Sequence, residues 1–183
     1  LQIESVGAGF TSTFLTSNWS LSNTLGGLTI GKSNSTSNVT IDSATTIAGP
    51  ITITGGVLGV NAPLTATNSV IKLKGSSISD GANGYVVADQ LAILGGTVAM
   101  DHASNNLNTL AASGVGSFTY VNSGALTIGT VNPTGISATG DVRIETLSGD
   151  LTLAADVTTS STTASGSRRR PRRRRRWPPR RRR

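Results

Sequence analysis

The sequence contains no cysteine, so neither a disulfide framework nor a thiolate metal site can form. Aromatic residues make up 4% of the 183 residues, and charged residues make up 14%. With so few bulky rings, the chain lacks the means to fill a large irregular core of the kind found in enzymes. No apolar run approaches the roughly 20 residues that a membrane-spanning helix requires. These absences favour a protein built from thin, regular layers of small and β-branched side chains.

Histidine is nearly absent as well, because His102 is the only one in the chain. A metal cluster built on several histidines is therefore excluded, and a Ser-His-Asp arrangement has a single histidine to draw on. Asp101 could in principle orient the ring of His102, but the surrounding Met100–Asn106 is typical of a polar turn between strands. We expect a protein that is not an enzyme, with no catalytic residue, no cofactor and no metal.

The charges are divided between two unlike regions. Residues 1–167 contain nine acidic residues and only four basic ones, which gives a net charge of −5. Residues 168–183 contain twelve arginines and no acidic residue, which gives +12. The overall charge of +7 therefore describes neither region. The body of the chain is mildly acidic, and only its C-terminal segment is basic.

The C-terminal segment combines these arginines with three prolines and Trp177. Repulsion among the guanidinium groups predicts that residues 161–183 form a disordered linker and Arg/Pro-rich tail. A genuine tail would bind nucleic acid or other polyanions without sequence preference. An out-of-frame reading of a GC-rich tract would give the same composition, and we favour that origin, or a truncation scar, over a selected nucleic-acid arm. The polyanion-binding residues of a genuine tail would be Arg168, Arg169, Arg170, Arg172, Arg173, Arg174, Arg175, Arg176, Trp177, Arg180, Arg181, Arg182 and Arg183.

Ahead of the tail, apolar and polar residues alternate in short segments. The segments are Ile51–Ile53, Val57–Val60, Val70–Lys74, Leu91–Ile93, Thr97–Met100, Phe118–Val121, Leu126–Ile128, Val142–Ile144 and Leu151–Leu153. Alternation of this length predicts short strands with one buried face, and the glycine-rich and polar stretches between them predict turns. We therefore expect an all-β fold.

The strand segments recur at a nearly regular distance. Ile51 and Ile71 are 20 residues apart, Leu126 and Leu151 are 25 apart, and each interval holds about three strand segments. Repeats of this length are typical of solenoids, and three short strands fit one coil of a parallel β-helix. We predict roughly five or six such coils over residues 39–160. An antiparallel sandwich is the rival fold, but the brevity of the strands and the scarcity of aromatic residues disfavour it.

Residues 1–38 are less regular than the rest of the body. Phe10, Phe14 and Trp19, three of the body's few aromatic residues, fall in this stretch. We interpret it as an irregular N-terminal edge or a partial coil that packs on the end of the rod. The chain starts without a methionine, which indicates a fragment or a processed product of a longer protein.

Two stretches resemble the repeats of filamentous haemagglutinin-like large exoproteins of Gram-negative bacteria. One is Ile47–Leu58, with its run Ile-Thr-Ile-Thr-Gly-Gly, and the other is Ala125–Ala154, with its runs Leu-Thr-Ile-Gly-Thr and Asp-Leu-Thr-Leu-Ala. The resemblance covers about residues 24–165. It implies a right-handed parallel β-helix, or β-solenoid, together with export to the cell surface and adhesion as the usual role.

Taken with the composition, this resemblance predicts a structural, adhesive segment of a secreted or cell-surface bacterial exoprotein associated with the outer membrane. Its partners would be glycans or proteins of a host or neighbouring cell, contacted through many weak interactions. One alternative is a protein that binds nucleic acid or other polyanions through the arginine tail.

Another alternative is a polysaccharide-active β-helix enzyme, which would need converging carboxylates such as Asp141 and Glu145. Arg143 lies between them on the same face of a strand, so a solvated charged face is the simpler interpretation. The segment Asp80–Gly84 is only a faint match to a calcium-binding loop, because the fixed ligand spacing is missing.

Overall fold

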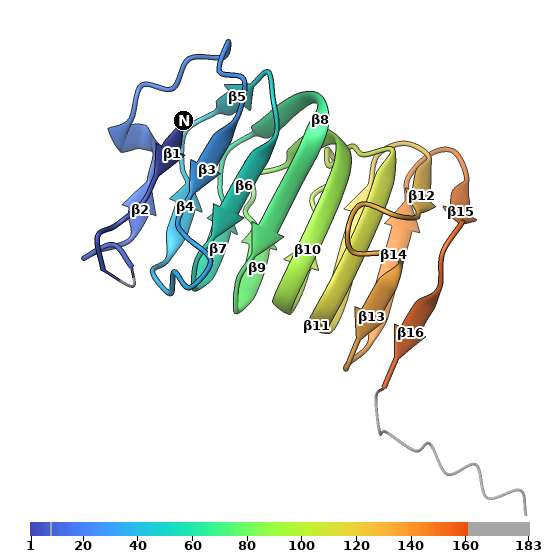
Figure 1. The fold of residues 1–183 in the computed structure, drawn as a ribbon. Coiled ribbons are helices and arrows are strands. Elements are labelled where there is room, and N and C mark those ends of the chain that lie inside the picture. Colours follow the sequence, from blue (N-terminus) through green and yellow to red (C-terminus); the bar gives the residue numbers. More distant parts are fainter. Residues whose placement is uncertain (8, 161–183) are drawn as a thin grey trace, which may run out of the picture.

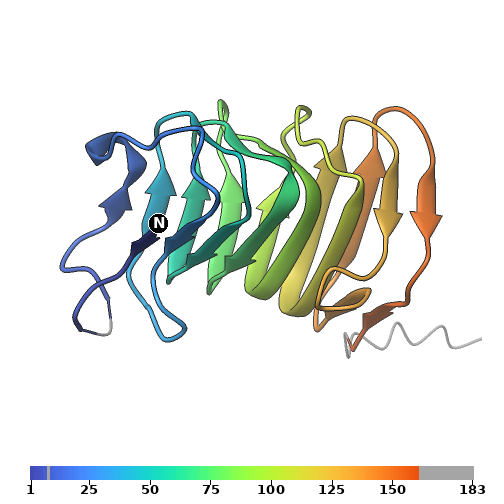
Figure 2. The ribbon, with the colours of Figure 1, turned by 45° about the horizontal axis from the view of Figure 1, so that its top comes forward.

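The structure, a computed structural model, describes residues 1–7 and 9–160. Over these residues the chain forms an all-β parallel β-solenoid of about seven turns, which confirms the predicted fold class. Successive coils follow one another along a single axis, with the N terminus at one end and residue 160 at the other (Figures 1 and 2). The only helical element in the described part of the chain is a 3₁₀ turn, η1 (Thr16–Asn18). No helix in that part is long and apolar enough to span a membrane.

Sixteen strands join one sheet that winds around the rod, and every pairing between named strands is parallel. In chain order they are β1 (Gln2–Ile3), β2 (Phe14–Leu15), β3 (Leu28–Ile30), β4 (Val39–Ile41), β5 (Thr45–Ile47), β6 (Ile51–Thr54), β7 (Val57–Val60), β8 (Leu64–Lys74), β9 (Ser77–Asp80), β10 (Val86–Met100), β11 (Thr109–Asn122), β12 (Leu126–Ile128), β13 (Ile136–Ala138), β14 (Val142–Thr146), β15 (Leu151–Leu153) and β16 (Val157–Thr159).

The segments predicted from alternation are confirmed as strands. Val57–Val60, Leu126–Ile128 and Leu151–Leu153 coincide with β7, β12 and β15. Leu91–Ile93 and Thr97–Met100 are both parts of β10, because this strand bends around a corner of the rod without ending. The stretch that the sequence left as an irregular edge or partial coil contributes β1, β2 and β3.

The strands are arranged on three faces of the rod. The first face runs from β1 through β3, β6 and parts of β8, β10 and β11 to β12 and β15. The second face runs from β2 through β4, β7, β9 and the C-terminal parts of β10 and β11 to β14. The third face contains β5 and the N-terminal parts of β8 and β10. β13 and β16 continue the sheet beside β11.

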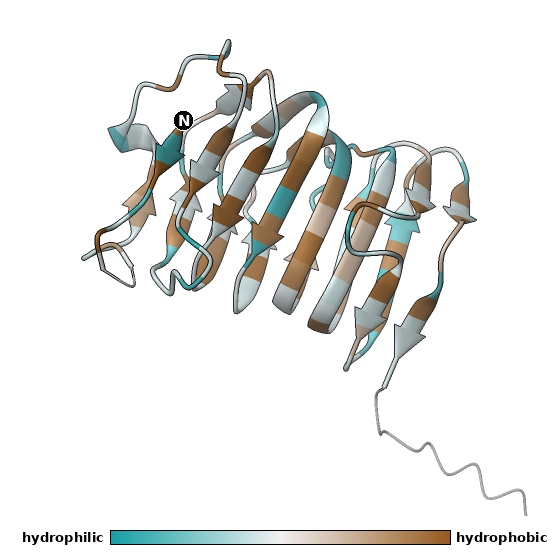
Figure 3. Cartoon of the chain, in the orientation of Figure 1, coloured by the Kyte–Doolittle hydropathy of each residue, from teal (hydrophilic) through white to brown (hydrophobic). Residues whose placement is uncertain are grey.

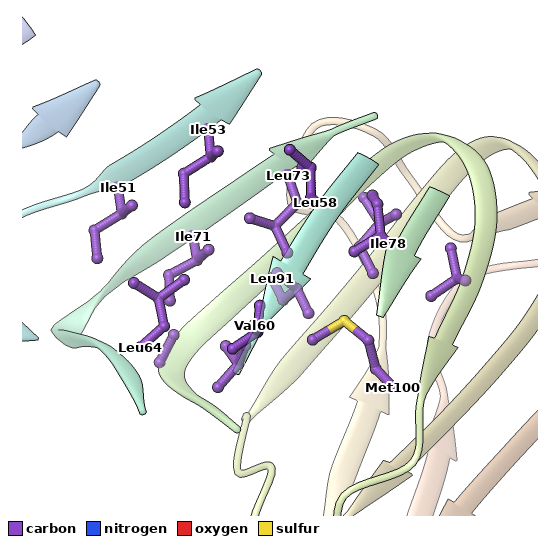
Figure 4. Packing of buried hydrophobic residues seen from close by; sticks show 14 of the residues in the cluster. Ile51, Ile53, Leu58, Val60, Leu64, Ile71, Leu73, Ile78, Leu91 and Met100 are labelled. Atoms are coloured by element: carbon purple, nitrogen blue, oxygen red, sulfur yellow. The ribbon is translucent and has the colours of Figure 1, made fainter. Parts of the chain in front are cut away.

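The core is a set of apolar columns enclosed by the three faces. Apolar and polar residues alternate along the strands (Figure 3), and inward side chains from different faces meet in the interior (Figure 4). On the first face, partners 18 to 25 residues apart stack in the column Leu28, Ile51, Ile71, Leu91, Leu110, Ile128 and Leu153. All of them except Leu153 are at most 2% exposed. The inward apolar residues of successive coils therefore stack into one continuous core.

Gly31 shows why small residues are needed where the chain turns between faces. Its φ is +75°, in the left-handed region that side chains disfavour. A Cβ at this position would lie 2.1 Å from the carbonyl oxygen of Thr54 in the next coil. Both the backbone conformation and the neighbouring coil therefore require glycine here.

Asn122 is a buried polar residue that organises the turn after β11. It is fully buried, and its Oδ1 accepts a hydrogen bond from the backbone N–H of Leu107 at 2.9 Å. Its Nδ2 donates to the carbonyl oxygens of Leu107, Gly124 and Ala125, each at 3.1 Å. One amide group therefore satisfies four backbone groups of two neighbouring coils, and its two hydrogen bonds with Leu107 are buried.

One loop lies against the outside of the first face. Gly129–Gly135 connects β12 and β13, and its Val131 packs on Ala92 and Ala111. These two alanines occupy outward positions on their strands, yet both are fully buried. Their small side chains leave the space in which the loop rests.

Candidate functional site

The structure places His102 in a turn after β10, as the sequence predicted. Its ring lies against that of Tyr85, with ring centroids 5.6 Å apart. The backbone N–H of Ser104 donates to Nδ1 at 3.1 Å, and Nε2 lies 3.2 Å from the carbonyl oxygen of Ala82. Nδ1 therefore contacts the backbone of its own turn, and Nε2 contacts that of the turn in the preceding coil. In the described part of the chain, no three histidine or acidic side chains are grouped so that they could hold a metal ion.

Asp80 is a half-buried carboxylate at the corner beside this turn. It is in register with Val60, an inward apolar residue of the preceding coil. Its carboxylate accepts hydrogen bonds from Nδ2 of Asn105 at 2.8 Å and from the backbone N–H groups of Asp101 and His102 at 3.1 Å. Burial raises the pKa of Asp80, and these hydrogen bonds offset part of the rise. The carboxylate thus holds a turn of its own chain, in the segment Asp80–Gly84 that faintly matches a calcium-binding loop.

Tyr120 lies in the core near this corner. Its side chain is fully buried, and its hydroxyl has no hydrogen-bond partner among the described residues. Burial, with a smaller contribution from the charge of Asp80, raises the pKa of Tyr120 well above its usual range. Shifted pKa values are often associated with functional sites. Here Tyr120 is enclosed in the core and Asp80 is hydrogen-bonded to a turn of its own chain, so we assign neither to a ligand site.

The carboxylates that the enzyme alternative required, Asp141 and Glu145, lie just before β14 and on it. Arg143 forms an ion pair with Glu145, and both side chains are largely exposed to solvent. Asp141 immediately precedes the strand and is also exposed. All three side chains are therefore in contact with solvent.

The polyanion-binding residues predicted in the tail, Arg168–Arg183 with Trp177, lie outside the described residues. The linker predicted for residues 161–167 lies outside them too. The remaining body of the chain contains only four basic residues, which are Lys32, Lys72, Lys74 and Arg143. A polyanion-binding function would therefore depend on the tail.

A hollow of about 230 Å³ opens on the surface at the corner between the third and first faces. Two alanines that belong to the hydrophobic core, Ala66 and Ala88, lie at its edge. Its polar lining consists of Thr65, Thr67, Asn68, Asp89, Asn106 and Asn108. Nδ2 of Asn108 donates to Oδ1 of Asp89 at 2.8 Å, which holds the two side chains in a fixed relative position.

A second hollow, of about 450 Å³, adjoins the first at Asn108, which lines both. Its small lining residues are Ala125 and Gly149, and its polar ones include Thr127 and Thr152, which are register partners on neighbouring coils. Asp150 adds a carboxylate. The two hollows together are named the side groove, and its polar residues come from successive coils of the rod.

The side groove presents hydroxyl, amide and carboxylate groups on coils about 4.8 Å apart. These groups donate and accept hydrogen bonds, so they suit a ligand that carries many hydroxyl groups. Among the residues that the structure describes, no aromatic side chain lines either hollow of the groove. A sugar ring would therefore find no stacking platform there, and its binding would depend on several weak hydrogen bonds made at once.

A third hollow, of about 430 Å³, lies at the N-terminal end of the rod. The aromatic residues that the sequence singled out gather in it: the ring centroid of Phe14 is 5.1 Å from that of Phe10 and 5.7 Å from that of Trp19. Phe14 is buried, whereas Trp19 is 48% exposed. This surface is named the N-terminal hollow.

Asp42 fastens the N-terminal coil to the next one. The hydroxyl of Ser17 donates to Oδ2 at 2.6 Å, while the backbone N–H of Ser17 and the hydroxyl of Thr16 donate to Oδ1 at 2.8 and 3.1 Å. The hydrogen bonds from Ser17, and more weakly that from Thr16, lower the pKa of Asp42 because they favour its charged form.

Sequence reasoning missed the side groove. Asp89 and Asn108 are 19 residues apart, the same distance that separates the register partners Leu91 and Leu110. This shared spacing is the signal that could have placed both polar residues on one corner. Asn68, which lines the first hollow, has a φ of +50° inside β8. The alternation of apolar residues in the sequence does not indicate this backbone conformation.

No protein-family model matches the chain, and no curated protein and no solved structure matches it significantly. The resemblance to exoprotein repeats is therefore supported by the structure at the level of the β-solenoid fold. Any argument about function must therefore start from the surface of the rod.

Proposed function

We propose that this chain is an adhesive segment of a bacterial exoprotein, a rod that presents the side groove to glycans of a host or neighbouring cell. The observation that carries this proposal is the groove, where polar side chains of successive coils line adjoining hollows beside Asn108. A linear saccharide lying along the rod would meet Asp89, Asn108 and Thr127 in turn. The role is one of binding rather than catalysis.

Two properties of the rod support this role. Its backbone groups are satisfied between coils, so a solenoid keeps its outer side chains in fixed positions without a bulky core. Its groove holds several weak hydrogen-bonding positions in a row, and such positions gain affinity when one ligand engages them together. Location outside the cell, in association with the outer membrane, completes the proposal and follows from the resemblance to exoprotein repeats.

The test is binding of the full chain to an immobilised array of neutral glycans, followed by titration of the best-retained saccharide. We expect Asn108→Ala and Asp89→Asn each to weaken binding by about tenfold, the loss that follows from removing one or two hydrogen bonds. The matched control is Asn83→Ala, which removes an exposed asparagine in a turn away from the groove. Equal affinities of all three variants and the wild type would contradict the proposal.

Neutral glycans are chosen because twelve arginines in residues 168–183 would retain any sulfated or phosphorylated ligand. Binding through these arginines would fall steeply as salt is raised, whereas hydrogen bonding to a neutral saccharide would change little. Retention of polyanions alone, lost at high salt and unaffected by Asn108→Ala, would support the alternative of a polyanion-binding tail.

A further inference from the structure

The turn between β9 and β10 contains the two dipeptides of this chain that most readily form cyclic imides. Asp80–Gly81 is the only Asp-Gly pair in the sequence, and Asn83–Gly84 is the only Asn-Gly pair. Because glycine has no side chain, its backbone nitrogen can approach the side-chain carbonyl carbon of the residue before it without hindrance. The structure holds the two pairs in different ways.

Asp80 and Gly81 are both fixed by contacts with neighbouring coils. The carboxylate of Asp80 accepts three hydrogen bonds from residues that follow β10. The backbone N–H of Gly81 donates to the carbonyl oxygen of Val60 in the preceding coil at 2.8 Å. The carboxylate and the nitrogen that would have to meet are therefore each bound elsewhere.

Asn83 is held much more loosely. Its side chain is exposed and makes no hydrogen bond within the described part of the chain. The backbone N–H that follows it, that of Gly84, donates to the carbonyl oxygen of Gly81 at 3.0 Å and closes a four-residue turn. Inside this turn the carbonyl oxygen of Ala82 lies 3.2 Å from Nε2 of His102. The nitrogen beside Asn83 is therefore held by a hydrogen bond of its own turn.

We propose that Asn83 is a deamidation site controlled by this turn: it reacts when the turn Gly81–Gly84 opens, and its isoaspartate product keeps the turn from closing again. In the first step, hydroxide removes the proton of the Gly84 nitrogen, and this nitrogen forms a bond to Cγ of Asn83. The bond from Cγ to Nδ2 breaks, and Nδ2 leaves as ammonia after taking a proton from water.

One water molecule then opens the resulting five-membered imide. Breaking the bond between Cγ and the Gly84 nitrogen gives aspartate with an unchanged main chain. Breaking the bond between the main-chain carbonyl carbon of residue 83 and that nitrogen gives isoaspartate, whose main chain runs through Cγ. Both products add a negative charge to the turn.

The closed turn opposes the first step. The Gly84 nitrogen must lose its proton and turn towards Cγ of Asn83, and both changes require that its hydrogen bond to Gly81 breaks first. The reactive conformation therefore belongs to the locally opened state of the coil, which is a minor population of the folded protein.

Isoaspartate lengthens the main chain by one atom at a point that has no room for it. Gly84 is buried, and a Cβ built on it would overlap the carbonyl oxygen of Val60 and lie 2.9 Å from Cα of Asn61. An additional main-chain atom just ahead of Gly84 displaces this residue from the space in which it fits. Aspartate leaves the main chain as it is, so isoaspartate alone is expected to loosen the turn.

Deamidation of the full chain is followed in mildly alkaline buffer by mass spectrometry of its peptides, with the chain either folded or unfolded in guanidinium chloride. We expect the product at Asn83 in both states, at least about tenfold more slowly in the folded chain. We expect no isoaspartate at Asp80 while the chain is folded. Asn83→Gln is the matched control, because glutamine forms its larger imide ring far more slowly.

His102→Ala tests the turn itself. It removes the contact with the carbonyl oxygen of Ala82, so deamidation of the folded variant is expected to be faster than that of the folded wild type. The rates of the two unfolded chains are expected to be equal. Circular dichroism establishes that the variant is folded, and if it is not, the two rates of the wild type decide.

Thermal unfolding separates the two products. Asn83→Asp reproduces the aspartate product and is expected to melt with the wild type. The isoaspartate fraction of aged wild-type protein, separated by chromatography, is expected to melt at a lower temperature. Equal rates of deamidation in the folded and unfolded wild type would overturn the proposal. An isoaspartate fraction as stable as Asn83→Asp would overturn it too.

Discussion

Ile128 and Leu153 occupy the same inward position on neighbouring coils, yet Ile128 is fully buried and Leu153 is 63% exposed. The two side chains are similar in size and are carried by strands of equal length, β12 and β15. They differ because β12 has a coil on each side, whereas β15 is the edge of the first face. Position in the stack, rather than residue type, therefore sets burial in this protein.

This relationship predicts unequal costs for the same truncation. Ile128→Ala leaves a cavity in the core and is expected to lower the free energy of unfolding by about 2–5 kcal/mol. Leu153→Ala removes a side chain that is mostly in water, and is expected to cost less than about 1 kcal/mol. Urea unfolding, at a concentration where the chain is monomeric, measures both. Equal losses would contradict the assignment of β15 to an uncovered edge.

A substitution of Asn122 tests the hydrogen bonds by which its side-chain amide joins two coils. Asn122→Ala leaves the backbone groups of Leu107, Gly124 and Ala125 without their partner. Each buried group left unpaired costs about 1–3 kcal/mol, and the N–H and carbonyl of Leu107 are both buried, so the variant is expected to lose at least about 2 kcal/mol of unfolding free energy. Asn34→Ala, in an exposed turn, is the control and is expected to stay within about 0.5 kcal/mol of the wild type. Similar losses in both variants would rule out the buried network.

Gly31 and Gly114 separate backbone strain from crowding between coils. Both have positive φ, but a Cβ at Gly114 meets nothing within 4 Å, while one at Gly31 would lie 2.1 Å from the Thr54 carbonyl oxygen. Gly114→Ala is therefore expected to cost only the conformational penalty of about 1–2 kcal/mol. Gly31→Ala is expected to cost several times as much or to prevent folding, as judged by thermal unfolding. Equal melting temperatures would show that the coils do not approach this closely.

Asp42 predicts a dependence of stability on acid pH. Because its pKa is lowered in the folded state, its carboxylate stabilises the fold above the ordinary value of 3.8, and this contribution is lost as pH falls through the lowered value. Asp42→Asn is expected to unfold at lower urea concentration than the wild type at pH 7, and the gap is expected to close at about pH 2.

Asp150→Asn is the control for this comparison, because it replaces an exposed carboxylate with the same amide. The Asp80 carboxyl, whose pKa is raised by burial, titrates in every one of these proteins and cancels from the differences. A gap between Asp42→Asn and the wild type that stays constant from pH 7 to acid would contradict the role of the charged Asp42.

The sequence was sufficient to predict the fold class because a solenoid repeats one local pattern. The alternation at Val57–Val60 and Leu151–Leu153 predicted strands, and the 20-residue spacing of Ile51 and Ile71 is the spacing of true register partners. Parallel stacking then follows, since no coil buries its inward face alone.

The side groove could not be predicted from the sequence, because it depends on how the corners of successive coils align. Asp89 lies at a register shift within β10, and Asn108 lies in the bend before β11, so no alternation marks their face. Their contact arises only once neighbouring coils are in register. The burial of Asn122 could not be predicted for a similar reason. An asparagine at the end of a strand is typical of a turn, and only the three-dimensional structure shows that its side chain is buried.

The central proposal, glycan binding in the side groove, is tested most directly by two-dimensional NMR of the ¹⁵N-labelled full chain titrated with the neutral saccharide best retained on the array. The account predicts that shifted amide signals cluster at Thr65, Thr67, Asp89, Asn106 and Asn108, with saturable dependence on saccharide concentration. Shifts confined to the second face, at Thr40, Ser79 and Thr119, would contradict it. So would the absence of any shift with every neutral saccharide on the array.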